Sequence, residues 1–94
     1  MTNNTIISEE DSLIEYPCAF TVKVMGAALP EFRTKIMQIT QKHDPQFNET
    51  KVKEKFSKGN KYLSLSLTIW AKDRAQLDAL YEELTSCELS LWVI

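Results

Sequence analysis

Residues 61–70 have the clearest alternation of hydrophobic and polar positions in the chain. From Leu63 to Ile69, every second residue is a large aliphatic one, and the positions between them carry hydroxyl groups until Trp70. Strict alternation predicts a β-strand with one buried face and one open face. Such strands are typical of an antiparallel sheet that helices cover on one side only. We therefore place this strand near the centre of such a sheet.

Three other segments, residues 18–25, 47–56 and 88–94, show weaker alternation and are also interpreted as strands. The second of them carries lysines on its polar face, which is typical of an edge strand protected against pairing with other chains. The side chains that we expect to face the core from these strands are Phe20, Val22, Val24, Val52, Phe56, Leu89, Leu91 and Val93.

Two segments have the three-and-four spacing of amphipathic helices. The first has Pro30 in its opening turn and ends near His43. The second begins at Asp73, which with Gln76 resembles a capping box, and it ends near Ser86. The expected buried stripes are Leu29, Phe32, Ile36, Ile39 and His43 in the first helix and Leu77, Leu80, Tyr81 and Leu84 in the second.

The elements follow one another as strand, helix, strand, strand, helix, strand. Two right-handed crossovers and one hairpin join such elements into an α+β, ferredoxin-like βαββαβ sandwich, with a four-stranded antiparallel sheet of order 4-1-3-2 and both helices on one face. This order places the lysine-rich strand at an edge, as its composition predicts. Residues 13–94 then form a single domain, and the polar, acidic residues 1–12 are expected to be a flexible N-terminal tail.

Composition excludes several classes of function. A formal net charge of −2 provides no concentrated basic surface, which argues against a nucleic-acid partner. No segment approaches the ~20 apolar residues of a membrane span, and the N-terminus lacks a leader pattern, so we expect a cytoplasmic protein. One histidine and two distant cysteines form no metal-ligand or catalytic spacing, so we expect neither an enzyme nor a bound metal or cofactor.

The same order of elements occurs in RNA-recognition domains and in copper carriers, but their motifs are missing here. RNA-recognition domains stack bases on aromatic side chains of the third strand, where this chain has Ser64, Ser66 and Thr68. Copper carriers need a Cys-x-x-Cys in the first loop, where residues 26–29 read Gly-Ala-Ala-Leu. Neither activity is therefore expected.

Several stretches carry a resemblance to known proteins: Tyr16-Pro17-Cys18, Phe20, Lys23-Val24-Met25-Gly26, Ser57-Lys58-Gly59-Asn60-Lys61-Tyr62-Leu63-Ser64 and Gln76-Leu77-Asp78-Ala79-Leu80-Tyr81-Glu82-Glu83-Leu84. Together they resemble the YbeD-like family of small uncharacterised bacterial proteins over residues 13–94. The resemblance implies a ferredoxin-like domain similar to the regulatory ACT modules that bind amino acids. It implies no particular activity, and no site residue can be transferred from it.

The function that we favour is a regulatory, non-enzymatic protein contact on the open face of the sheet. Strict alternation from residue 88 points Ser90, Trp92 and Ile94 away from the core, and we expect Trp70 on the same face at the same corner. This last strand carries no lysine or proline against edge pairing. Such a surface fits self-association or binding of a partner protein.

Two alternatives stay open. The side chains of Leu13, Ile14 and Tyr16 would cover the apolar corner within one chain. Otherwise the domain is a sensor of ACT type, in which a small carboxylate ligand, an amino acid or an organic acid, binds at the end of the sheet where the first helix begins. The residues expected to hold such a ligand are Gly26, Lys58, Gly59, Asn60 and Lys61.

We expect Cys18 and Cys87 to be free thiols. They lie at the starts of the first and last strands, at opposite ends of the sheet, so about seven residues at ~3.3 Å each separate them by ~20 Å, against ~6 Å between the Cα atoms of a disulfide. A denatured, non-reduced sample should react with two equivalents of a thiol reagent. Reaction with fewer than two would contradict this prediction.

Overall fold

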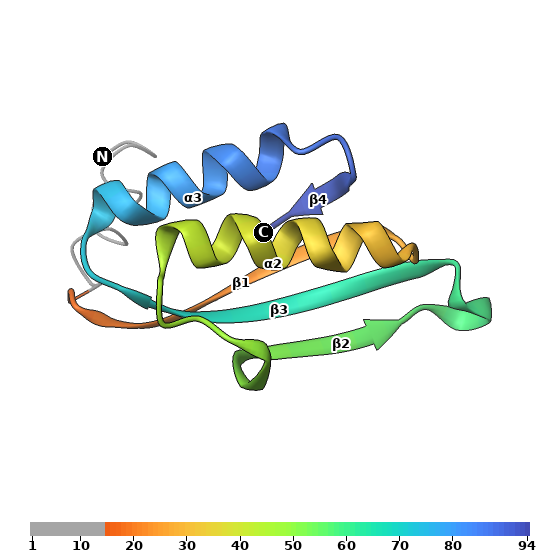
Figure 1. The fold of residues 1–94 in the computed structure, drawn as a ribbon, viewed down its shortest axis with the longest axis horizontal. Helices are drawn as coiled ribbons and strands as arrows, with labels where there is room; N and C mark the ends of the chain where they lie inside the picture. Colours follow the sequence, from red (N-terminus) through yellow and green to blue (C-terminus); the bar gives the residue numbers. More distant parts are fainter. Residues whose placement is uncertain (1–14) are drawn as a thin grey trace, which may run out of the picture.

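The structure is a computed structural model that describes residues 15–94, shown in Figure 1. The expected tail, with Leu13 and Ile14, lies outside the described residues. The elements, in chain order, are β1 (Cys18–Ala27), α2 (Pro30–His43), the 3-10 turn η1 (Glu49–Lys51), β2 (Val52–Phe56), the 3-10 turn η2 (Lys58–Asn60), β3 (Tyr62–Ala71), α3 (Arg74–Ser86) and β4 (Ser90–Val93).

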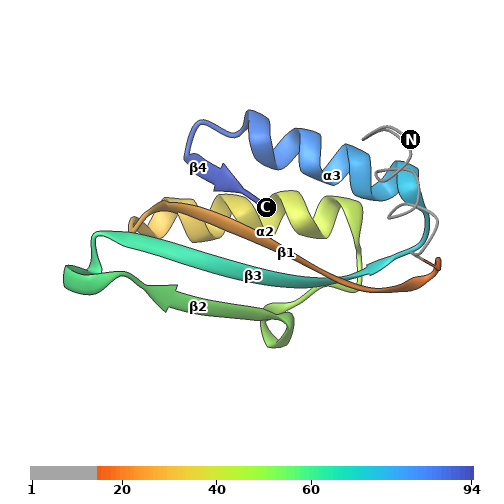
Figure 2. The same ribbon diagram turned by 180° about the vertical axis from the view of Figure 1, so that it is seen from behind.

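The four strands form one sheet of order β2-β3-β1-β4, and every neighbouring pair is antiparallel. Both helices pack on one side of this sheet: α2 lies in front of β1 in Figure 1, and β1 lies in front of α2 in the opposite view of Figure 2. The order is the expected 4-1-3-2 arrangement, so the ferredoxin-like α+β prediction is confirmed.

The aliphatic face of β3 forms the middle of the hydrophobic core. Its side chains from Leu63 to Ile69 are at most 3% exposed, whereas the hydroxyl positions between them are half-buried. Each buried leucine contributes roughly 1.5–3 kcal/mol relative to an exposed one. The other core side chains are Val22, Val24, Phe32, Ile36, Met37, Ile39, Phe47, Ala71, Leu77, Leu80 and Leu84.

Two boundaries differ from the sequence-based expectation. The strand predicted over residues 47–56 is regular only from Val52, because Asn48 caps a 3-10 turn by accepting a hydrogen bond from the backbone N–H of Thr50 (2.9 Å). Phe47 is buried in the connection that precedes this turn. Leu29 was expected in the buried stripe of the first helix, but it is the extended residue before α2 and is exposed.

A β-bulge interrupts the pairing of β4 with β1. Met25 lies opposite Trp92, but the next residue of β1, Gly26, lies opposite Ser90. One step along β1 therefore matches two steps along β4, and Leu91 is the extra residue.

The bulge overturns two sequence-based predictions. Leu91 was expected to face the core, but it is 61% exposed. Ser90 was expected on the open face, but its Oγ is buried and has no hydrogen-bond partner among residues 15–94. The prediction failed because strict alternation assumes an uninterrupted strand, and one extra residue changes the faces of Ser90 and Leu91. Leu89, which precedes the strand, packs against the core as predicted.

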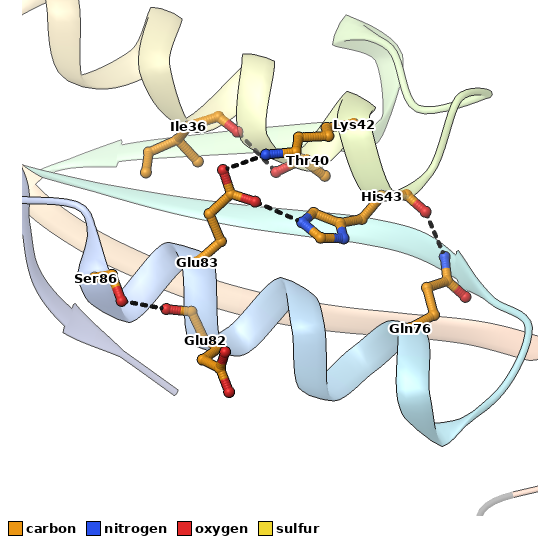
Figure 3. Close-up of polar contacts among 8 residues, drawn as sticks. All are labelled: Ile36, Thr40, Lys42, His43, Gln76, Glu82, Glu83 and Ser86. Carbon is orange, nitrogen blue, oxygen red and sulfur yellow. Dashed lines mark hydrogen bonds and ion pairs between the residues drawn. The ribbon is translucent and has the colours of Figure 1, made fainter.

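A polar cluster joins the two helices, as Figure 3 shows. The carboxylate of Glu83 on α3 accepts a hydrogen bond from Lys42 Nζ (2.9 Å), and its other oxygen lies 2.8 Å from His43 Nε2. The side-chain hydrogen bonds from His43 and Lys42 lower the pKa of Glu83 below its ordinary value. Glu83 thus connects the last turn of α2 to the last turn of α3.

Hydrogen bonds of Gln76 link the start of α3 to the end of α2 and to the end of β3. Its amide nitrogen donates to the carbonyl oxygens of His43 (2.9 Å) and Trp70 (3.1 Å), and its amide oxygen accepts from the N–H of Lys72 (2.5 Å). The backbone N–H of Gln76 donates to the side chain of Asp73 (2.9 Å), which confirms the predicted N-cap.

The backbone at Gly26 leaves no room for a side chain. A Cβ there would lie 2.5 Å from the carbonyl oxygen of Leu89 and 2.6 Å from the ring of Phe32.

We expect Gly26→Ala to lower the free energy of unfolding by about 3 kcal/mol, because the added methyl group would overlap backbone atoms that cannot easily move. Urea denaturation measures this loss. The control is Gly59→Ala, where φ is +79° and the space is open, so only a backbone cost of about 1–2 kcal/mol applies. An equal loss in both variants would contradict the packing explanation.

The Glu83 cluster predicts a pH-dependent stability. Because the folded-state pKa of Glu83 lies below its ordinary value of 4.5, its carboxylate stabilises the fold above that pH, and the contribution is lost as the pH falls through the folded-state pKa. Glu83→Gln should therefore melt below the wild type at pH 7, and the two melting temperatures should converge in acid. Glu82→Gln, an exposed neighbour, is the control. A difference that persists at low pH would argue against the ionic contribution.

Candidate protein-contact surface

The open face of the sheet carries two regular rows of side chains across all four strands. Strand pairing sets the rows, with Ile94 joined to β1 by two backbone hydrogen bonds to Lys23 (2.8 and 3.0 Å). From β4 to β2, the rows are Ile94-Lys23-Ser66-Lys53 and Trp92-Met25-Ser64-Lys55. We call them the open-face rows. They are apolar at the β4 end and basic at the β2 end.

A shallow hollow of about 310 Å³ lies over the open-face rows. A smaller one, of about 120 Å³, shares Met25, Lys55 and Ser64 with it and continues to Tyr62 and Phe56. The larger hollow is lined by Lys23, Met25, Lys55, Ser64, Trp92 and Ile94. The two together form a depression that crosses the sheet.

The C-terminal strand exposes a cluster of large apolar side chains. Leu91, Trp92 and Ile94 are 61%, 60% and 65% exposed. Within residues 15–94 the strand pairs only with β1 and so lies at the edge of the sheet, and it contains no lysine or proline. The opposite edge, β2, carries Lys53 and Lys55. The expectation of one guarded and one unguarded edge is therefore correct.

Trp70 does not share this corner, contrary to the prediction. It lies opposite Ala19, whereas Trp92 lies opposite Met25, so six residues of β1, or ~20 Å, separate the two positions. The reason is that β4 has four residues and pairs only with the second half of β1. Of the four predicted contact residues, the structure brings together Trp92 and Ile94, places Trp70 elsewhere on the sheet, and buries the hydroxyl of Ser90.

The residues predicted to hold a carboxylate ligand lie at one end of the sheet. The backbone N–H of Ala28, just before α2, donates to the carbonyl of Lys61 (3.1 Å), and residues 58–60 form an exposed turn beside it. The ring of Phe32 and the carbonyl oxygen of Leu89, however, pack directly against Gly26 and leave no space beside it. The glycine therefore serves close packing and does not open a cradle for a ligand.

Tyr16 does not cover the apolar corner. It packs against the hydrophobic core, two residues before Cys18, and that end of β1 pairs with Ala71, far along the sheet from Trp92. Its hydroxyl is buried without a partner among the described residues. Leu13 and Ile14 lie outside the described part of the chain, so their predicted role stays a prediction.

Reactive side chains are dispersed in the structure. His43 is held by Glu83, which gives it a role in helix packing. Cys18 and Cys87 are both free thiols. Within residues 15–94, no three acidic, histidine or cysteine side chains come together as metal ligands, and no helix has the length and apolarity to cross a bilayer.

Comparison with known proteins identifies the family. Residues 11–94 match the family described as "Protein of unknown function (DUF493)". A UPF0250 protein of Leptothrix cholodnii is 49% identical over 79 residues, which are 84% of this chain and 87% of the relative. A UPF0250 protein of Janthinobacterium sp. is 42% identical over 84 residues, which are 89% of this chain and 92% of the relative. These matches confirm the YbeD-like resemblance, and this chain belongs to the DUF493 family.

Proposed function

We propose that this chain is a non-enzymatic, cytoplasmic regulatory module that works by protein contact, through the β4 edge and the adjoining open face. The observation that carries the proposal is the exposure of Leu91, Trp92 and Ile94 together on an unguarded edge strand. Exposed apolar clusters of this kind are costly on a monomer and are common at interfaces. Tryptophan is also among the residues that most often dominate binding energy. The similarity to ACT modules that the family resemblance implies supports the regulatory part of the proposal.

The β4 edge suits a second copy of the chain. The outer side of an edge strand has unpaired N–H and C=O groups, which pair readily with another strand. Two copies related by a twofold axis would align their β4 strands and continue one sheet through both domains. Trp92 and Ile94 of each copy would then flank the new pairing on the open face.

Self-association through stacked open faces is disfavoured by charge. Stacking would bring Lys23, Lys53 and Lys55 of one copy toward the same lysines of the other. Like charges placed across an interface cost several kcal/mol. The edge is therefore the contact that we assign to self-association, and the open face stays accessible in it.

The test is the hydrodynamic mass of the intact chain by sedimentation. We expect a dimer for the wild type, and Trp92→Ser should weaken it by about 2 kcal/mol, or roughly thirtyfold in the dissociation constant, because it removes a central aromatic contact. The matched control is Trp70→Ser, an exposed tryptophan of the same face that lies away from the edge. A wild type that stays monomeric at all concentrations would refute the edge contact.

A further inference from the structure

We infer that the open face binds an acidic, extended segment of a partner protein. One carboxylate of the segment lies near Ser64 and Ser66 between the lysines, a second lies beyond it over the lysines of β2, and an apolar side chain lies over Trp92 and Ile94. The inference rests on the proposed function, because it names the partner chemistry of the same surface. The charge, spacing and apolar content of the open-face rows support it.

The charged side chains on the open face are all of one sign. The register places three charged side chains on this face of the strands, and all are exposed lysines: Lys23, Lys53 and Lys55. No carboxylate pairs with them within residues 15–94. On the helix side, by contrast, Arg33 pairs with Glu54 and Lys42 pairs with Glu83. A chain of net charge −2 thus has a basic face whose lysines have no ionic partner within residues 15–94.

The spacing of the lysines suits a carboxylate. Lys23 on β1 and Lys53 on β2 both lie opposite Ser66 of β3, so two strand spacings, about 10 Å, separate their Cα atoms. A carboxylate above β3 lies between the two ammonium groups and within reach of both flexible side chains. Ser64 and Ser66 supply hydroxyl donors beneath it.

The β4 end of the open-face rows favours an apolar residue in the bound segment, next to that carboxylate. Trp92, Ile94 and Met25 line this end of the hollow. An extended segment that crosses the strands presents every second side chain to the sheet, about 7 Å apart. The favoured segment therefore has an apolar residue followed, two and four positions later, by glutamate or aspartate.

A nucleic acid fits this face less well than a peptide. The positions used for base stacking in the middle of β3 carry Ser64, Ser66 and Thr68, and Thr68 shares a hydroxyl hydrogen bond with Thr21 (3.2 Å). Without adjacent aromatic rings, successive bases have no stacking platform. The exposed aromatic side chains of this face are Trp92 on the edge strand and Tyr62 and Trp70 at the two ends of β3, so none lies in the middle of β3.

The experiment is a titration of the ¹⁵N-labelled full chain with a capped five-residue peptide, leucine followed by serine, glutamate, serine and glutamate. We expect saturable shift changes at the amides of Lys23, Lys53, Ser64 and Ser66 and at the Trp92 indole. Lys53→Glu should weaken binding about tenfold or more, because a charge-assisted contact becomes a repulsion. Amide spectra of Lys53→Glu verify that this variant is folded. If it is not folded, Lys53→Gln replaces it, with a smaller expected loss of peptide affinity.

The controls separate this inference from its alternatives. Lys35→Glu makes the same charge change on the exposed side of α2 and should bind like the wild type. Equal binding of a peptide with glutamine in place of glutamate, shift changes elsewhere, or no shifts at millimolar peptide would overturn the inference. So would tighter binding of an oligo-thymidine to the same residues. The titration measures peptide binding at the open-face rows directly. Peptide binding can therefore be absent while the β4 edge still self-associates, and it can be present when the chain is a monomer.

Discussion

The structure depends on the burial of one face of β3 under both helices. Leu65 and Leu67 are completely buried there, and the side chains between them are small and hydroxylated. Both helices cover the aliphatic face, and within residues 15–94 no element packs on the other face of the sheet. The surface that we assign to function is therefore a direct consequence of how the core is built.

Charge is divided between the two sides of the sheet. On the helix side, Glu83 of α3 pairs with Lys42 of α2, and Glu54 of β2 pairs with Arg33 of α2. The lysines of β1 and β2 that point the other way have no such partners within the described residues. Exposed ion pairs add little stability to a fold. The separation of charge between the two sides of the sheet therefore matters mainly for recognition, because it makes one face of an acidic chain basic.

The bulge in β4 connects packing with recognition. Gly26 lets the carbonyl of Leu89 and the ring of Phe32 approach the backbone of β1 closely. Just beyond this contact, the extra residue Leu91 is turned outward beside Trp92. A regular strand would have placed Leu91 in the core and Ser90 outside. The bulge thus increases the apolar surface of the unguarded edge.

The sequence by itself determined the order of elements, the buried face of β3 and the cap at Asp73, because each follows from local periodicity or from a short-range hydrogen bond. The sheet order then follows from the order of elements, because crossover connections are right-handed and a hairpin joins neighbouring strands. It also distinguished the guarded edge from the unguarded one. Only the tertiary structure decided the faces of Ser90 and Leu91 and the distance between Trp70 and Trp92. Those depend on where β4 pairs along β1 and on one extra residue in that pairing, which is set by packing around Gly26 and leaves no periodic signal in the chain.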